Sequence, residues 1–161
     1  PPAKVSEVAR PSYWAGVRFL EEDNNYVAAE SAFRDATVRD PESPDSFASL
    51  AMTQELQGKF ADAKRNFEKA LSLDPKNGAA LGGMAQLEYE HGRYESAIRK
   101  YTQMLDMVPD CGHASFGLAM SHKAMGHKQE SSKFFNMYLQ CGPTPRNAAY
   151  AKAQLEGYER K

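Results

Sequence analysis

Proline recurs in this chain at a constant interval of 34 residues, and no other feature of the sequence restricts the fold as strongly. The prolines of this series are Pro41, Pro75, Pro109 and Pro143. A residue that tolerates a left-handed backbone recurs at the same interval, at Asn24, Gly58, Gly92 and Gly126. A fixed period of roughly 20–50 residues is typical of folds built from stacked copies of one unit. The sequence therefore predicts four units, over residues 10–43, 44–77, 78–111 and 112–145.

Two further positions keep the same register in every unit. An aromatic residue closes the second half of each unit, at Phe33, Phe67, Tyr101 and Phe135. A small residue precedes each aromatic, at Ala29, Ala63, Ala97 and Ser131. Four features that hold one register through four units indicate a true repeat.

The second unit shows how this pattern becomes structure. Apolar residues from Phe47 to Leu56 follow helical spacing, and Gly58 ends that helix. A second helix is predicted from about Ala61 to Leu73, and Pro75 ends it because proline cannot continue a helix. Each unit is thus a helix hairpin that cannot bury its own apolar face and must stack on its neighbours.

These repeats resemble the tetratricopeptide repeat family. Residues 44–77 match the family pattern best, at Phe47, Leu50, Ala51, Gly58, Phe60, Ala63, Phe67, Ala70 and Pro75. The resemblance implies an all-α, right-handed superhelical solenoid of four helix hairpins plus a C-terminal capping helix over 146–161. Residues 10–161 are then a single domain. Residues 1–9 carry little apolar content and two prolines, so we predict a flexible lead-in there.

The first and fourth repeats depart from the family pattern. Gly16 occupies the usual large apolar place in the first repeat, so we expect its opening helix to shift by one residue and to use Trp14 and Val17. In the fourth repeat, His122 and Lys128 stand where apolar or small residues are expected. Terminal repeats are commonly atypical, so these departures do not change the fold that we expect.

The resemblance places a partner-binding groove along the first helices of successive repeats. The matching positions are Trp14, Arg18, Met52, Leu56, Gly82, Gly83, Gln86, Tyr89, Phe116, Gly117 and Met120. A glycine inside a helix costs roughly 1 kcal/mol relative to alanine, so the three glycines of this set need an explanation. Either the groove uses the space that they leave, or neighbouring helices pack closely against them. The sequence favours neither explanation.

Composition and motifs point away from catalysis and from two other classes of partner. The 20 basic and 21 acidic residues give no electrostatic reason to bind nucleic acid. No apolar run is long enough for direct insertion into a membrane. No phosphate-binding loop or nucleophile motif occurs, so we expect no enzyme activity and no cofactor. The spacing of His113, His122 and His127 near Cys111 does not match a zinc site, and no metal is expected.

We expect the chain to be a protein-interaction scaffold or chaperone-like adaptor that holds a partner peptide in the groove. The alternative is a self-assembly module whose groove binds another copy of the chain. Family members that hold the C-terminal carboxylate of heat-shock chaperones use lysine, arginine and asparagine at set groove positions. Only Arg18 has a charge of that kind here, so this clamp is not expected. In size and repeat count the chain is similar to secretion chaperones of bacterial injection systems and to outer-membrane pilot lipoproteins.

The cysteines and the first residue bear on the compartment. Cys111 and Cys141 are predicted to lie at the same end of the stack. They form either a disulfide, which would indicate an oxidising compartment, or two separate thiols, which we favour. The chain starts with Pro1 and not with methionine, which is typical of a trimmed or processed product, and the sequence leaves open whether an upstream segment was removed. Two locations stay open, the cytoplasm and a periplasmic or membrane-anchored position.

Overall fold

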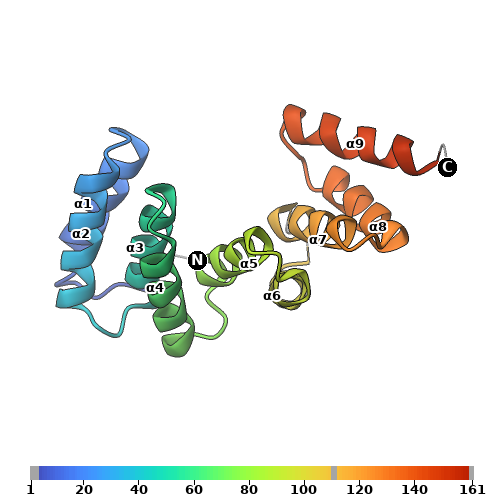
Figure 1. The fold of residues 1–161 in the computed structure, drawn as a ribbon. Coiled ribbons are helices and arrows are strands. Elements are labelled where there is room, and N and C mark those ends of the chain that lie inside the picture. Colours follow the sequence, from blue (N-terminus) through green and yellow to red (C-terminus); the bar gives the residue numbers. More distant parts are fainter. Residues whose placement is uncertain (1–3, 110–111, 160–161) are drawn as a thin grey trace. The chain divides into compact units, whose positions relative to one another are not determined.

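A computed structural model describes residues 4–109 and 112–159. In these residues all regular structure is α-helical, and nine helices follow one another through short turns (Figure 1). The helices are α1 (Arg10–Glu21), α2 (Tyr26–Arg39), α3 (Pro44–Leu56), α4 (Phe60–Leu73), α5 (Gly78–Glu90), α6 (Tyr94–Met107), α7 (Gly112–Ala124), α8 (Lys128–Gln140) and α9 (Pro145–Glu159). The predicted all-α fold, with two helices in each repeat and one helix after the last repeat, is confirmed.

Each hairpin turn contains a residue with a left-handed backbone at the predicted place. The φ angle is 74° at Gly58, 73° at Gly92 and 78° at Gly126. Asn24 takes the same role in the first repeat, with a φ angle of 48°. Glycine adopts this conformation without a Cβ clash and asparagine tolerates it, which explains why only these two residue types occur in the series.

Polar side chains fix three of the helix starts. The Asn25 side chain accepts a hydrogen bond from the backbone N–H of Ala28 at the start of α2, over 3.1 Å. Ser43 caps α3 and Asn77 caps α5 by bonds of the same kind, over 3.2 and 2.9 Å. The first N–H groups of a helix have no partner inside it, so these bonds set where each helix begins.

The aromatic residues of the second helices form much of the core. Phe33, Phe67, Tyr101 and Phe135 are at most 1 % exposed. The ring of Phe67 lies against Gly83, and the ring of Tyr101 lies against Gly117. Phe135 shares a core cluster with Ala151 of α9. In all three cases the small residue comes 16 places after the aromatic, so one repeat's ring fills the space that the next helix leaves.

The first repeat packs differently from the prediction. A Cβ on Gly16 would lie 2.8 Å from the ring of Phe33, so this ring occupies the usual place of a large apolar side chain. Tyr13 is buried and Val17 packs against the same core. Trp14, in contrast, is 58 % exposed. The prediction that α1 uses Trp14 in the core is therefore wrong, because Tyr13 and Val17 are the α1 side chains that pack there.

By its contacts the chain divides into two compact units, Pro1–Met84 and Ala85–Lys161, which we call unit 1 and unit 2. The boundary falls inside α5. The sequence predicted one domain over residues 10–161. In a repeat protein each repeat contacts only its neighbours, so the chain has no single central core and can divide into compact units.

A buried carboxylate joins α2 to the second repeat within unit 1. Glu30 accepts hydrogen bonds from Arg34 (2.8 Å), Gln54 (3.2 Å), Gln57 (3.0 Å) and Lys59 (2.6 Å). Burial by itself raises the pKa of Glu30, but these bonds outweigh burial and lower that pKa to about 2. The ionised carboxylate therefore holds α2 against α3 and the α3–α4 turn.

Residues 4–9 differ from the flexible lead-in that the sequence predicted, because they pack on unit 1. Val5 is 7 % exposed and Ala9 is fully buried, and both belong to the core cluster around Phe33. The segment contains few apolar residues, but these two lie four positions apart and face the same core. Its low apolar content was therefore a poor guide to its packing.

Acidic side chains at the end of α2, at the start of α3 and after α4 hold the same segment. The backbone N–H of Ser6 donates to Asp40 over 2.7 Å, and that of Lys4 donates to Asp45. The Lys4 ammonium pairs with Asp74 over 2.7 Å. These partners lie 34 to 70 residues away, so no local pattern could have indicated them.

The last helix covers the end of unit 2, as predicted. Ala151 and Leu155 of α9 pack in the cluster that contains α8 residues. Lys152 occupies the place that Leu118 holds one period earlier, and Lys152 is exposed whereas Leu118 is fully buried. One face of α9 thus packs on the stack and another is polar, which suits a capping helix.

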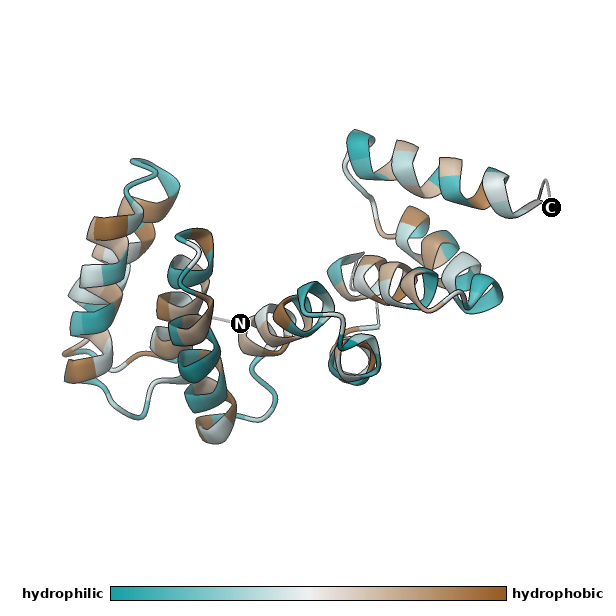
Figure 2. Cartoon of the chain, in the orientation of Figure 1, coloured by the Kyte–Doolittle hydropathy of each residue, from teal (hydrophilic) through white to brown (hydrophobic). Residues whose placement is uncertain are grey.

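Polar and apolar residues alternate along the helices (Figure 2, teal and brown). This alternation is typical of helices that share a core on one face and meet water on another. Among the described helices, none combines the length and the apolar character that crossing a bilayer requires.

Candidate peptide-binding surfaces

Unit 1 exposes large apolar side chains on α1 and α3, the first helices of its two hairpins. Trp14 is 58 % exposed, Met52 is 42 % exposed and Leu56 is 57 % exposed. Met52 and Leu56 lie four positions apart on one face of α3. Arg18, also exposed, lies four positions after Trp14 on α1. These four side chains, all predicted groove residues, are open to solvent, as a binding surface requires.

A contact between Tyr13 and Ser49 links the two helices beside this surface. Ser49 Oγ donates to the Tyr13 hydroxyl over 3.3 Å. The ring of Trp14 packs edge-on against the ring of Tyr13, with centroids 5.5 Å apart. Burial raises the pKa of the Tyr13 hydroxyl, so this hydroxyl stays protonated at neutral pH. We call the exposed set Trp14, Arg18, Met52 and Leu56 the inner face of unit 1.

Close packing explains two of the three predicted groove glycines. A Cβ on Gly83 would overlap the ring of Phe67, and a Cβ on Gly117 would overlap the ring of Tyr101. The space beside these glycines is therefore filled by the preceding repeat and is not available to a ligand. Gly82 is buried as well.

The remaining predicted residues of α5 lie in unit 2 and are half-buried. Gln86 donates to Glu90 over 2.7 Å and accepts from the Tyr101 hydroxyl over 3.3 Å. The ring of Tyr89 lies 5.5 Å from that of Tyr94, centroid to centroid. Both predicted side chains thus have contacts inside the chain and present only part of their surface to solvent.

Phe116 lies closer to the core of unit 2 than the groove prediction implied. Its ring centroid is 4.9 Å from that of Tyr138 and 6.1 Å from those of Phe135 and Tyr150. The contact of Tyr150 with α7 was not among the contacts predicted for the capping helix. The main role of Phe116 is therefore to pack against these rings, and its side chain is only partly exposed. Met120, one turn further along α7, is half-buried beside it.

Two adjoining hollows of about 300 and 340 Å³ lie where α7, the end of α8 and α9 meet. They share Phe116 and Asn147, so we treat them together as the α7–α9 hollow. Its lining consists of Gly112, His113, Phe116, Met120, Tyr138, Cys141, Gly142, Pro143, Thr144, Arg146, Asn147 and Tyr150. The sequence analysis missed Arg146, Asn147 and Tyr150. The spacing of Arg146 and Tyr150, four positions apart on one face of α9, is the signal that could have found them.

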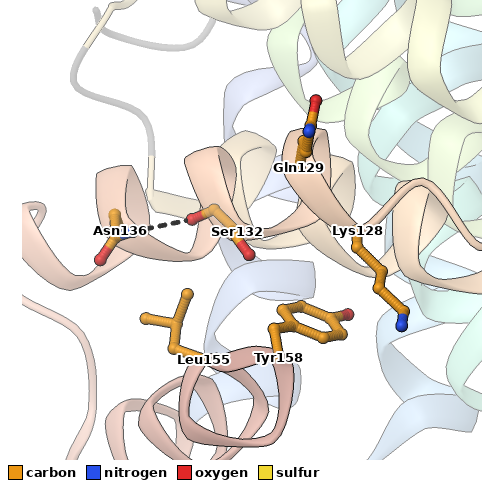
Figure 3. A pocket seen from close by; sticks show the side chains of 6 residues that line it. All are labelled: Lys128, Gln129, Ser132, Asn136, Leu155 and Tyr158. Carbon is orange, nitrogen blue, oxygen red and sulfur yellow. Dashed lines mark hydrogen bonds between the residues drawn. The ribbon is translucent and has the colours of Figure 1, made fainter. Parts of the chain in front are cut away.

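A third hollow of about 290 Å³ lies between α8 and α9 (Figure 3). The figure shows Leu155 and Tyr158 of α9 below a wall of polar side chains from α8, namely Lys128, Gln129, Ser132 and Asn136. The Tyr158 hydroxyl hydrogen bonds with Ser131 over 3.1 Å, which fixes the ring at one end of the hollow. The hollow marks where α9 lies on α8 without filling all the space between them.

Comparison with known families decides what these repeats are. The family described as Tetratricopeptide repeat matches residues 55–99 and 88–155, which together cover more than half of the chain. The chain belongs to the tetratricopeptide repeat family. No curated protein sequence is significantly similar to it.

Solved structures share the tetratricopeptide fold at low sequence identity. PilF from Pseudomonas aeruginosa aligns with a TM-score of 0.85 and 22 % identity, over 96 % of this chain and 70 % of that chain. MamA from Desulfovibrio magneticus RS-1, from position 41 to its end, aligns with a TM-score of 0.80 and 12 % identity, over 96 % and 88 %. The first tetratricopeptide domain of RPAP3, bound to an HSP90 peptide, aligns with a TM-score of 0.70 and 20 % identity, over 76 % and 97 %. At these identities the similarity shows the fold.

A tetratricopeptide fold is a scaffold for protein–protein interaction. The class of partner that the family supports is accordingly a protein or a peptide. The inner face of unit 1 and the α7–α9 hollow of unit 2 both combine apolar exposure with polar groups.

The tetratricopeptide hairpin turn of the fourth repeat brings two histidines together. The Nδ1 atoms of His122 and His127 are 3.4 Å apart, and His122 stacks on Phe134 with ring centroids 5.6 Å apart. Burial lowers the pKa of His122, so its ring is neutral at pH 7. Within the described residues, no three His, Cys, Asp or Glu side chains gather at one point. The stack on Phe134 accounts for the departure from the family pattern at His122.

Cys111 lies outside the described residues, so the choice between a Cys111–Cys141 disulfide and two thiols stays a prediction. Its neighbour Gly112 is placed beside Cys141: a Cβ on Gly112 would lie 3.4 Å from the Cβ of Cys141. The start of α7 and the end of α8 therefore lie at the same end of unit 2.

Proposed function

We propose that this tetratricopeptide protein is a scaffold or chaperone-like adaptor. It binds a peptide segment of a partner protein on the first helices of its hairpins. The observation that carries this proposal is the exposure of Trp14, Met52 and Leu56 on α1 and α3. A peptide that covers these side chains removes apolar surface from water, which gains about 25 cal/mol for each Å² buried.

The residue types of the inner face suit an adaptable peptide site. Tryptophan and arginine are enriched among the residues that dominate binding energy at interfaces. Methionine is flexible and polarisable, so Met52 can fit apolar anchors of different shape. Arg18 adds one positive charge beside Trp14, which favours a carboxylate on the peptide.

The RPAP3 domain in complex with the peptide SRMEEVD shows that this fold can hold a short peptide. The present chain offers Arg18 as the single matching charge among the family's clamp positions. We therefore propose that its peptide is held mainly by an apolar anchor and not by a carboxylate clamp of that type.

Self-assembly, in which the groove binds another copy of the chain, is the alternative function, and exposed side chains of α2 offer a further apolar surface for it. Val27 and Val38 of α2 are each 72 % exposed, so unit 1 has apolar side chains outside its inner face. Molar mass from light scattering over a range of protein concentrations separates the two functions. A constant monomer mass supports the peptide scaffold, and a mass that grows with concentration supports self-assembly.

The direct test is selection from a phage-displayed random peptide library on the immobilised protein. The proposal predicts enrichment of peptides that carry an apolar or aromatic anchor, and micromolar binding of the corresponding synthetic peptides in solution. A selection on the Met52→Asp variant serves as the matched control. If the wild type enriches no peptide that the variant fails to enrich, the proposed function is wrong.

A further inference from the structure

The α7–α9 hollow combines an aromatic wall with cationic and amide groups that the chain itself leaves unpaired. Resting on the proposed function that the chain binds peptides, we propose that this hollow binds a peptide carboxylate that lies beside an apolar or aromatic side chain. The hollow lies entirely within unit 2 and is separate from the inner face of unit 1. Arg146 and Tyr150 of this hollow lie on α9, after the four repeats that carry the family's clamp positions.

The apolar part of the hollow is held rigidly. The ring of Phe116 is fixed from three sides by Phe135, Tyr138 and Tyr150. The ammonium of Lys123 donates to the Tyr150 hydroxyl over 2.8 Å and lies 5.1 Å from the centre of that ring. A wall that is already ordered loses little entropy on binding, so it suits an aromatic or aliphatic side chain of the ligand.

The polar groups of the hollow are complementary to a negatively charged ligand group. In the part of the chain that the structure describes, Arg146 has no ion pair and the amide of Asn147 has no hydrogen-bond partner. Among the described residues that line the hollow, none is acidic. A guanidinium and an amide N–H at neighbouring positions are donors that a carboxylate accepts well. The ligand group that complements both is therefore a carboxylate.

The backbone at the hollow also favours a negatively charged ligand group, but more weakly than the side chains do. Gly112 is the first residue of α7, and Arg146 and Asn147 lie in the first turn of α9, so two helix N-termini face the hollow. Helix N-termini carry partial positive charge and favour anions. This effect supports the side-chain donors and does not replace them.

The carboxylate can be a Glu or Asp side chain or the C-terminus of the partner, and the probes must separate these sources. We would use four fluorescein-labelled heptapeptides that share one central or terminal phenylalanine. The first has Glu next to Phe and an amidated C-terminus, and the second has Gln in place of that Glu. The third ends in Phe with a free carboxylate, and the fourth ends in Phe amide. Fluorescence anisotropy measures each dissociation constant.

We expect at least one charged peptide to bind about tenfold more tightly than its neutral partner, because a charge-assisted hydrogen bond is lost in the neutral one. The Arg146→Gln variant should reduce this ratio to less than about twofold. Arg99→Gln, an exposed arginine of α6 outside the hollow, is the matched control and should leave the ratio unchanged. Helical circular dichroism confirms that both variants are folded.

Three results would overturn the inference. They are equal binding of charged and neutral peptides, an unchanged ratio in Arg146→Gln, and no binding by any of the four peptides. In each of these cases the proposed function still stands if library-selected peptides bind the wild type and lose affinity in Met52→Asp. If those peptides fail as well, the proposed function falls together with the inference.

Discussion

At the scale of single residues, glycines in the first helices of the hairpins control how closely neighbouring repeats approach one another. The aromatic ring of the preceding repeat occupies the place where a Cβ on Gly117 would lie, and the ring belongs to the fully buried Tyr101. Gly117→Ala should lower the free energy of unfolding by about 1–3 kcal/mol through overpacking. The cost of overpacking exceeds the gain of roughly 1 kcal/mol that alanine brings over glycine through its helix propensity. Gly157→Ala on α9, where a Cβ would meet nothing within 4 Å, is the matched control and should stabilise. Urea unfolding of both variants measures the difference, and a Gly117→Ala variant as stable as the wild type would contradict this packing.

The charge state of Glu30 contributes to the stability of unit 1. Its pKa is about 2 in the folded chain, below the ordinary value of 4.5. The stabilisation from Glu30 is therefore fully present above about pH 4.5 and is lost as the pH falls towards 2. Glu30→Gln should cost about 2–3 kcal/mol at pH 7, a value that already allows for the solvent around Lys59 and Arg34.

The pH dependence gives this prediction a second readout. The stability difference between the wild type and Glu30→Gln should shrink as the pH is lowered from 5 to 2, because the wild-type carboxylate becomes protonated. The exposed Glu68, which pairs with Lys64 at 3.8 Å, offers the control: Glu68→Gln should change stability by less than about 0.5 kcal/mol. A difference for Glu30→Gln that is constant with pH would show that the carboxylate's charge is not the cause.

At the scale of elements, the segment before α1 acts as part of the core of unit 1. Val5 is 7 % exposed and Val8 is 65 % exposed, so the same substitution can be compared at a buried and an open position. Val5→Asp should destabilise unit 1 by about 2–4 kcal/mol, because it loses a buried side chain and buries a charge. Val8→Asp should have little effect. Thermal unfolding followed by circular dichroism measures both, and equal melting temperatures would mean that the segment is not anchored.

The same contrast shows what the sequence could and could not predict about elements. The turns at Gly58 and Asn24 follow from the period because their cause is local, a positive φ that few residues tolerate. The anchoring of Val5 depends on residues far apart in the chain, for which the period carries no signal. Tyr150 lies one period after Phe116, but it belongs to α9, which follows the last predicted repeat. The inner-face residues Trp14 and Met52 were predicted from the repeat register, and Arg146 was missed because α9 was treated only as a cap.

At the scale of the whole molecule, the repeats place their aromatic residues in the core and leave selected apolar side chains in solvent. Trp14, Met52 and Leu56 are apolar side chains that each leave 42 to 58 % of their surface exposed. A surface of this kind is consistent with a partner that covers it. The central claim is therefore that peptide binding depends on the inner face and not on apolar exposure in general.

The most direct measurement of that claim compares two aspartate substitutions at exposed apolar positions. A library-selected peptide is titrated calorimetrically into the wild type, into Met52→Asp on the inner face and into Val38→Asp on α2. We predict that Met52→Asp weakens binding about thirtyfold, the equivalent of about 2 kcal/mol at an interface centre, with an unchanged helical signal. Val38→Asp should bind like the wild type. Wild-type affinity in Met52→Asp together with lost affinity in Val38→Asp would contradict the account and move the binding site to the outer surface of α2.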